Sequence, residues 1–434
     1  MSDYLDFLAH KAITADEHGP QVDADLMHPY LFEWQRRIVA WALHVGRAAI
    51  WADTGLGKTL MQVEWARQIA GDNGTALIVA PLAVCYQTVR EARKINVHAT
   101  YIRDQADMTR PGVWVTSYEM IENFNPGDLD AVVLDEASIL KNSSGKTRNA
   151  MIAHFQTVPY RLACTATPAP NDPEELTNQA EFLGQMTRTL MLAAYFVHDQ
   201  DGWRLKGHAR RPMIRWMSSW AVAIRKPSDM GGDDTGYDLP GLNIVGHTVE
   251  ADVKEDGALF AVDLGGVQGR ANVRKQTLDA RCRKCADLIA AEPDEPWLIW
   301  TGLNDEADTI ARLIPDAVNV KGSMSPDEKA RALLDFADGT IPYLITKPSI
   351  ASQGLNYQHC ARMVFVGLSD SYEQYYQAIR RCYRYGQARV VDVHIVTSRL
   401  EGQIVANVRR KELQSATLTG ELVACMKESK EKAA

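Results

Sequence analysis

Short apolar runs alternate with longer amphipathic stretches in two separate parts of the chain. The first part begins near Tyr30 and contains the runs "AAIWAD", "TALIVAP", "ATYI", "GVWVTS", "AVVLDE" and "RLACTAT". Between several of these runs, apolar residues recur at helical spacing, as in "KTLMQVEWARQIAG". Because short apolar strands that alternate with helices form parallel sheets covered by helices, the pattern predicts an α/β lobe.

A second block of the same kind begins near Pro296. Its apolar runs are "WLIWT", "AVNVK", "YLITK", "MVFVG" and "VVDVHIV". Helical patterns lie between them, in "NDEADTIARLI", in "SPDEKARALLDFADG" and around "YYQAIRRCYRYGQ". The two blocks therefore predict two α/β lobes in tandem.

The region between the blocks, about 185–295, differs from both. It carries three tryptophans, an exposed Gly/Asp-rich loop "SDMGGDDTGYDLPG" and a helical pattern, "GRANVRKQTLDARCRKCADLIAA". We interpret it as a helical insertion and connector. The predicted domains are 1–184, 185–295 and 296–434, and the tail after Arg399 is expected to be helical.

Composition limits the class of protein. The chain has 434 residues, 46% hydrophobic residues and a net charge of −8, which is ordinary for a globular protein and unlike domains that coat DNA non-specifically. A local basic cleft on an acidic body remains compatible with nucleic acid as a partner. No segment resembles a signal peptide or a membrane span, so we expect a cytoplasmic protein with no membrane partner.

The seven cysteines are scattered and odd in number, which disfavours a disulfide framework. Cys282 and Cys285 form the C-x-x-C pair of the chain, without a second pair to complete a zinc site. Because they fall within a helical pattern, we interpret them as structural.

The segment "AAIWADTGLGKTL" has the order strand, glycine-bearing loop, helix. It matches the A-x-x-x-x-G-K-T variant of the phosphate-binding loop, with Ala52 where the first glycine is usual. Lys58 is expected to reach the β- and γ-phosphates of ATP, and the Thr59 hydroxyl to bind Mg²⁺. The loop residues expected to bind the nucleotide are Thr54, Gly55, Leu56, Gly57, Lys58 and Thr59.

The segment "LDAVVLDEASILKN" delivers Asp135 and Glu136 to the end of an apolar strand. One carboxylate there, Asp135, can hold Mg²⁺ opposite Thr59. Its neighbour Glu136 can orient and deprotonate the attacking water. An acidic helix start is the alternative interpretation, but together with the preceding loop the pair indicates a nucleotide triphosphatase.

"DEASILKN" also resembles the Walker B segment of the superfamily-two helicases, the DEAD/DEAH-box class, and in particular its Swi/Snf-type branch. The resemblance implies two RecA-like lobes. It also implies that Gln35 in "LFEWQRRIVAWAL" recognises adenine, and that "RLACTATPAPNDPEEL" is the third motif. The family's coupling positions fall on Ser138, which replaces a histidine, and on Thr165, Ala166 and Thr167.

In the second lobe, "LITKPSIASQGLNYQHC" resembles the fifth motif, with Gly354 at the nucleotide. "YYQAIRRCYRYGQ" resembles the sixth, which implies catalytic roles for Gln377 and for Arg381 and Arg384 as arginine fingers. We predict one helix over this segment, with Gln377, Arg380, Arg381 and Arg384 on a common face. Both motifs also resemble those of compact phage- or prophage-type members, which implies the cytoplasm of a bacterial or phage-infected cell.

The resemblance further implies contacts to a nucleic-acid backbone. The candidates are Pro81, Thr116, Ser117, Lys141 and Asn142 in the first lobe, and Thr301, Lys321 and Lys347 in the second. The expected function is ATP-dependent translocation on duplex DNA without strong sequence preference. A recruiting protein is a further possible partner, and nothing in the sequence indicates an oligomer. The alternatives are a helicase that separates DNA or RNA strands, and an ATP-gated DNA-binding protein with slow hydrolysis, which Ser138 and Ala52 favour.

Overall fold

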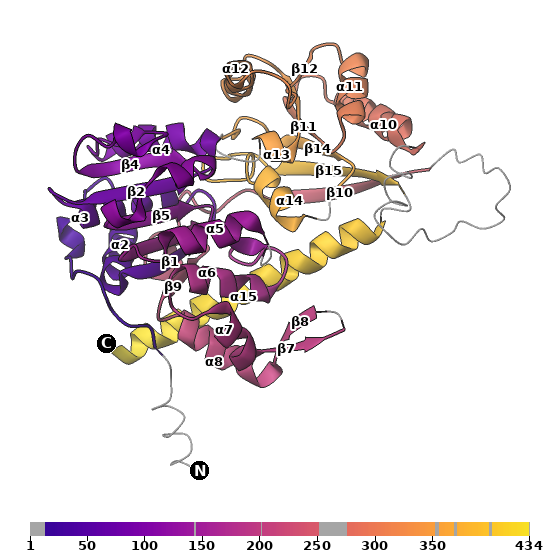
Figure 1. The fold of residues 1–434 in the computed structure, drawn as a ribbon. Coiled ribbons are helices and arrows are strands. Elements are labelled where there is room, and N and C mark those ends of the chain that lie inside the picture. Colours follow the sequence, from indigo (N-terminus) through magenta and orange to yellow (C-terminus); the bar gives the residue numbers. More distant parts are fainter. Residues whose placement is uncertain are drawn as a thin grey trace. The chain divides into compact units, whose positions relative to one another are not determined.

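The computed structural model describes residues 14–142, 145–200, 202–250, 276–351, 356–368, 371–398 and 402–433. Two compact units make up the chain. The first comprises Met1–Asp234 together with Gln414–Ala434, and the second comprises Thr235–Leu413. Each unit contains one parallel sheet with helices packed on it (Figure 1).

The sheet of the first unit has seven strands in the order β3-β4-β2-β5-β6-β1-β9. Their bounds are β1 Arg47–Ala52, β2 Thr75–Ala80, β3 Thr100–Tyr101, β4 Gly112–Ser117, β5 Ala131–Asp135, β6 Tyr160–Thr165 and β9 Ala221–Ile224. All neighbouring strands in it are parallel. The helices are α2 Glu33–Val45, α3 Lys58–Ala70, α4 Leu82–Lys94, α5 Lys146–Phe155, α6 Leu176–Phe182, α7 Arg188–Tyr195 and α8 Arg210–Met217, and an antiparallel hairpin is formed by β7 Phe196–Asp199 and β8 Gly202–Leu205.

The sheet of the second unit has six strands in the order β10-β15-β14-β11-β13-β12. Their bounds are β10 Leu242–Val249, β11 Trp297–Thr301, β12 Ala317–Asn319, β13 Tyr343–Thr346, β14 Arg362–Val366 and β15 Val391–Ser398. Again all neighbouring strands are parallel. The helices are α10 Leu278–Ala291, α11 Asn304–Leu313, α12 Pro326–Ala337, α13 Pro348–Ala351, α14 Tyr372–Ile379 and α15 Gly402–Ala433, whose residues from Gln414 onward belong to the first unit.

Short 3-10 helices connect several elements: η1 Ala24–Leu26, η2 Gln105–Asp107, η3 Tyr118–Asn123, η4 Pro126–Asp128, η5 Ala137–Lys141, η6 Pro173–Glu175, η7 Gly207–Ala209 and η8 Pro227–Met230. None of the helices in the described ranges has the length and apolar character that a membrane crossing requires.

The apolar runs of both blocks form strands, which confirms the α/β fold class. Strands β1, β2, β4, β5 and β6 are almost wholly buried, as a parallel sheet covered on both faces requires. All seven cysteines are free, and six of them, including Cys282 and Cys285 on α10, are buried. Within the described residues, no group of three or more acidic, histidine and cysteine side chains is arranged to hold a metal ion.

The region 185–295 differs from the helical connector that we expected. Within it, β9 pairs with β1 at the edge of the first sheet, and β10 pairs with β15 at the edge of the second. The hairpin β7–β8 also lies here. The chain therefore passes from the first unit to the second near Asp234, and 185–295 is divided between the two units.

The helix expected over "YYQAIRRCYRYGQ" is also shorter than expected. Helix α14 ends at Ile379, and the segment continues as tight turns. One cause is that the Arg381 carbonyl accepts a hydrogen bond from the backbone N–H of Tyr357 (2.8 Å), so that another loop takes up its acceptor. Arg381 and Arg384 thus lie on a turn packed against residues 356–360, and the common helical face that we predicted for them does not form.

A buried ion pair holds α10 against α11 in the second unit. Arg281 Nη1 lies 2.7 Å from Glu306 Oε1, and both side chains are fully buried. Glu306 Oε2 also accepts the backbone N–H groups of Gly302 and Leu303, each at 2.9 Å. One carboxylate therefore caps the start of α11 and fixes the loop that follows β11.

Replacement of Arg281 with methionine should leave the Glu306 carboxylate buried without the guanidinium charge that faces its Oε1. We expect a loss of roughly 3–5 kcal/mol in the free energy of unfolding of the second unit. Urea unfolding followed by tryptophan fluorescence measures this loss. The double variant Arg281→Met/Glu306→Gln should recover part of it, because the uncompensated charge is gone. Equal stability of Arg281→Met and the wild type would contradict the assignment.

Candidate functional site

The glycine-bearing loop after β1 is shaped to receive an anion. Gly55 and Gly57 have positive φ angles of 85° and 75°, which few other residues adopt. Helix α3 begins directly after Gly57, and no side chain caps its first N–H groups. Lys58 Nζ turns back over the loop and donates to the carbonyls of Ala52 (2.8 Å) and Asp53 (3.3 Å). Free helix N–H groups and a lysine amine therefore meet at one loop, as a phosphate site requires.

Gln35 is held against this loop. Its Nε2 donates to the carbonyl of Leu56 (2.9 Å), and its Oε1 accepts the backbone N–H of Phe32 (2.9 Å). A Cβ atom at Gly57 would lie 2.4 Å from Gln35 Nε2, so a larger residue there would displace the Gln35 amide from the loop. The structure thus places Gln35 beside the loop, and its predicted contact with adenine stays a prediction.

Asp135 ends β5 and is almost completely buried. Its Oδ1 accepts hydrogen bonds from Gln62 Nε2 (2.7 Å) and from the backbone N–H of Glu136 (3.1 Å). Burial raises the pKa of Asp135, while the Gln62 hydrogen bond and the Lys58 charge act in the opposite direction. The Tyr118 hydroxyl donates to the backbone carbonyl of Asp135, so hydrogen bonds hold both the side chain and the backbone of this residue.

Gln62 is the residue of this site that sequence reasoning missed. It lies on α3, one turn after Lys58, and its side chain is fully buried. A signal existed, because an amide in the middle of "LMQVEWA" interrupts a face that is otherwise apolar. Such a polar group needs a buried partner, and here the partner is Asp135.

Glu136 adopts a left-handed backbone conformation, with φ 56° and ψ 55°. This conformation is uncommon for a residue with a side chain, and such strain concentrates at functional sites. Thr165 Oγ1 donates to Glu136 Oε2 (3.3 Å) and accepts the Thr167 backbone N–H (3.1 Å). The third-motif threonines and Glu136 thus form one hydrogen-bonded group, with Ala166 between the threonines, while Ser138 is buried in η5.

The candidate nucleic-acid contacts of the first unit differ in how far their side chains are exposed. Pro81, which precedes α4, and Lys141 are partly exposed, and Asn142 is exposed. Thr116 is fully buried and its hydroxyl donates to the Ile102 carbonyl (2.9 Å), while Ser117 is buried as well. The expectation of a ligand contact from the Thr116 side chain is therefore corrected, because the core of the unit uses its hydroxyl.

In the second unit the three candidates come together. Thr301, Lys321 and Lys347 line one small polar pocket at the carboxyl ends of β11, β12 and β13. Asp308 lies in its wall and forms an ion pair with Lys321 (2.6 Å), and Asn319 Nδ2 donates to the same Asp308 oxygen (3.0 Å). The sequence did not indicate that the Asp308 carboxylate lies in the same pocket as Lys321 and Lys347.

The arginine segment after α14 packs tightly. Burial, together with the charges of Arg381 and Arg380, lowers the pKa of Arg384 to about 10, and this guanidinium donates to Asn356 Oδ1. Arg381 is only 9% exposed. The Arg380 guanidinium lies over the rings of Tyr376 and Tyr383, at 5.1 and 5.4 Å from their centroids.

Two glutamines organise the same segment. Gln387 Nε2 donates to the carbonyls of Cys360 (3.0 Å) and Cys382 (3.2 Å) and so joins two loops. Gln377 on α14 donates to Glu373 (3.4 Å). Gly354, expected at the nucleotide, lies outside the described residues.

Two family models match the chain. The SNF2-related domain covers residues 34–189, and the helicase conserved C-terminal domain covers residues 280–386. The first therefore spans the phosphate-binding loop, the carboxylate pair and the third motif. The second spans the polar pocket and the two arginines.

Curated relatives cover different shares of the chain. Chromodomain-helicase-DNA-binding protein 9 of Mus musculus is 30% identical over 35% of this chain and 6% of its own length. The DNA annealing helicase and endonuclease ZRANB3 of Mus musculus is 21% identical over 91% of this chain and 41% of its own length. The chain thus spans less than half the length of either relative.

Two solved structures align with the chain, and the first of them shares its fold. A variant of S. cerevisiae Dbp5 bound to RNA and ADP BeF3 aligns with a TM-score of 0.57 and 13% identity, over 87% of each chain. The Sulfolobus solfataricus SWI2/SNF2 ATPase core in complex with dsDNA aligns over 92% of this chain and 96% of its own, with 18% identity and a TM-score of 0.45. With both family models matched in order along two parallel-sheet units, the chain belongs to the SNF2-related, Swi/Snf-type branch of the superfamily-two helicases.

Proposed function

We propose that this protein is an ATP-hydrolysing motor that moves along duplex DNA. The observation that carries the proposal is the chain of hydrogen bonds that runs from Gln62, on the helix after the phosphate-binding loop, through Asp135 and Glu136 to Thr165 of the third motif. A phosphate site without this link would only bind nucleotide. With this link, Glu136, the residue that activates water in this proposal, is hydrogen-bonded to Thr165 at the end of β6.

The chain's own groups account for nucleotide binding. The N–H groups at the start of α3 and the Lys58 amine receive the β- and γ-phosphates, for which Lys58 exchanges its contacts to two loop carbonyls. Gln35, already seated on the loop, offers its amide to the adenine. The positive φ of Gly55 and Gly57 lets the backbone approach the anion closely.

Asp135 and Thr59 are suited to hold Mg²⁺. Within the described chain both hydrogen bonds to the Asp135 carboxylate go to Oδ1, which leaves Oδ2 as a hard oxygen ligand. A bound Mg²⁺ neutralises phosphate charge as it develops. Gln62 keeps the carboxylate in one orientation.

Glu136 accepts the proton of the attacking water. The Thr165 hydroxyl holds one of its oxygens and so directs the carboxylate. Family resemblance assigns Arg381 and Arg384 to the charge on the γ-phosphate, so closure of the second unit on the first is part of this proposal. Hydrolysis then alternates closed and open states, and each cycle shifts two groups of backbone contacts along the DNA.

The polar pocket of the second unit is the proposed phosphate contact on that side. Lys321 and Lys347 supply charge, and Thr301 lines the same pocket. In the first unit Pro81, Lys141 and Asn142 remain candidates. A phosphate-directed contact set of this kind carries little sequence information.

The proposal predicts that duplex DNA stimulates ATP hydrolysis more than single-stranded DNA or RNA. Phosphate release measured with each nucleic acid tests this, and displacement of a triplex-forming strand without separation of the duplex tests translocation. Glu136→Gln should bind ATP but hydrolyse it roughly 10²–10⁴-fold more slowly, because the general base is lost. Glu122→Gln, on an exposed side chain, is the matched control.

Two results would contradict the proposed translocation on duplex DNA. Hydrolysis that is equally fast with and without any nucleic acid would remove the coupling. Separation of the strands of a plain duplex would replace the translocase with a helicase. Normal turnover by Glu136→Gln would move the base to another residue.

Gln62→Met should raise the Mg²⁺ concentration needed for half-maximal hydrolysis roughly 10- to 100-fold, because the donor that orients Asp135 is lost while the volume is kept. A magnesium titration of phosphate release at saturating ATP measures the effect. Gln68→Met, on the same helix, is the control and should behave like the wild type. If the unfolding midpoint of Gln62→Met falls while its magnesium requirement stays normal, the glutamine is structural only.

Asp308→Asn should strengthen DNA binding at low salt several-fold, because Lys321 then loses its competing carboxylate. The slope of log affinity against log salt should steepen by up to about 0.9, the value for one further phosphate contact. Fluorescence anisotropy at several salt concentrations measures both quantities. Asp305→Asn, on an exposed position of the same helix, controls for net charge. An equal gain in both variants would show a general charge effect and exclude Lys321 as a phosphate ligand.

A further inference from the structure

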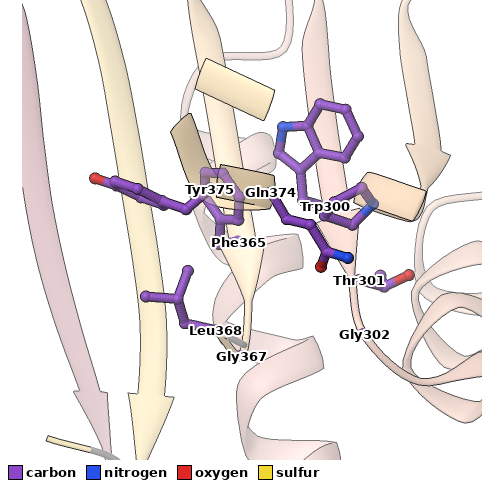
Figure 2. A pocket seen from close by; sticks show the side chains of 9 residues that line it. Trp300, Thr301, Gly302, Phe365, Gly367, Leu368, Gln374 and Tyr375 are labelled. Carbon is purple, nitrogen blue, oxygen red and sulfur yellow. The ribbon is translucent and has the colours of Figure 1, made fainter. Parts of the chain in front are cut away.

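A second pocket of the second unit adjoins the polar one. Figure 2 shows it at the carboxyl ends of β11 and β14, a cavity of about 50 Å³. Its walls are apolar: Trp300, Phe365, Leu368 and Tyr375 are all nearly buried. None of the described residues that line it is charged. The amide of Gln374 lies at the pocket and points toward the Thr301 side of it.

The two pockets share one wall. Thr301 lines both the apolar pocket and the polar pocket of Lys321 and Lys347. Only the Thr301 residue therefore separates a ligand group in one pocket from a ligand group in the other. If a phosphate of a nucleic-acid strand occupies the polar pocket, the group bonded directly to that phosphate faces the apolar one.

In a nucleic-acid strand, the group bonded directly to a phosphate is a sugar. The cavity is small, it is walled by hydrocarbon and aromatic surface, and it offers no charge. These properties suit the C–H face of a pentose better than a second phosphate or a whole base. We propose that the apolar pocket receives the deoxyribose attached to the phosphate bound by Lys321 and Lys347. This inference rests on the proposed function and adds to it the choice of sugar.

The pocket selects against a 2′-hydroxyl. The Thr301 hydroxyl is already used, because it donates to the Thr346 carbonyl (3.4 Å). The indole N–H of Trp300 is buried away from the cavity surface, so it offers no donor there. A ribose hydroxyl entering this pocket loses water and meets mostly apolar walls, with the Gln374 amide as a polar group at the Thr301 side, whereas the methylene group of deoxyribose has no hydrogen bond to lose.

The wall between the pockets is preformed. Glu306 Oε2 holds the N–H groups of Gly302 and Leu303, and Arg281 holds Glu306 in turn. Gly302 lacks a side chain where it lines the pocket, and its φ is not positive. A valine at this position adds a branched side chain to the lining of the pocket.

The test is fluorescence anisotropy with four labelled duplexes of one sequence. In each duplex the second strand is DNA, and the first strand is DNA, RNA, a 2′-fluoro strand, or DNA with abasic sites at alternate positions. The wild type should bind the RNA-containing duplex roughly tenfold more weakly than the DNA duplex. The 2′-fluoro strand, which has RNA-like shape but no hydroxyl, should bind like DNA. The abasic strand should bind like DNA as well, because the base lies outside the pocket.

Gly302→Val should weaken binding to the DNA duplex and bring the DNA and RNA affinities together. Gly322→Val is the matched control, because a Cβ atom there meets nothing within 4 Å, and it should keep the wild-type preference. Circular dichroism melting confirms that both variants are folded.

The outcomes separate the two proposals. If the wild type binds none of the duplexes, the proposed function and the sugar site both fail. If it binds DNA and RNA equally, and Gly302→Val behaves like the control, the sugar site alone is overturned. Weak binding of the 2′-fluoro strand would show a preference for duplex shape, and weak binding of the abasic strand would place a base in the pocket. Either result also overturns the sugar site.

Discussion

All strands within each of the two large sheets run in the same direction, and every candidate site of this protein depends on that constraint. Parallel strands place their carboxyl ends on one edge of the sheet, and loops at that edge are where open α/β sheets bind ligands. In the first sheet β5, β6 and β1 are neighbours, so the carboxylate pair, the third motif and the phosphate-binding loop meet. In the second sheet β14, β11, β13 and β12 are neighbours, and their ends form the two adjoining pockets.

Buried polar contacts keep these edges in one arrangement. Gln62 reaches Asp135 through the core of the first unit, and Glu306 reaches the loop after β11 through the core of the second. Each contact has a desolvation cost, and a buried ion pair such as Arg281–Glu306 gives little net stability over an apolar pair. The benefit of the Arg281–Glu306 pair is geometric, because a carboxylate that accepts hydrogen bonds from two backbone N–H groups restricts the conformation of the loop after β11.

The apolar runs were sufficient to predict most strands, because a buried parallel strand must be apolar along its length. They were not sufficient for β9, with only four residues, or for β10, which is half exposed and interrupted by Gly246. Helical periodicity also extended α14 too far, since the backbone N–H that bonds to the Arg381 carbonyl comes from Tyr357, a partner distant in sequence. In the same way, motif spacing identified Asp135 and Lys58 but neither Gln62 nor Asp308, whose roles exist only once the sheet is folded.

The two units hold their charged groups in different ways. In the first, Asp135 and Glu136 are oriented by neutral donors, Gln62 and Thr165. In the second, cations are held by acceptors that compete with a ligand: Asp308 holds Lys321, and Asn356 holds Arg384. In the proposed function, a phosphate displaces these acceptors, so its binding to the second unit yields less free energy than the charges alone would give. Weaker binding of this kind would let the proposed motor release DNA within one ATP cycle.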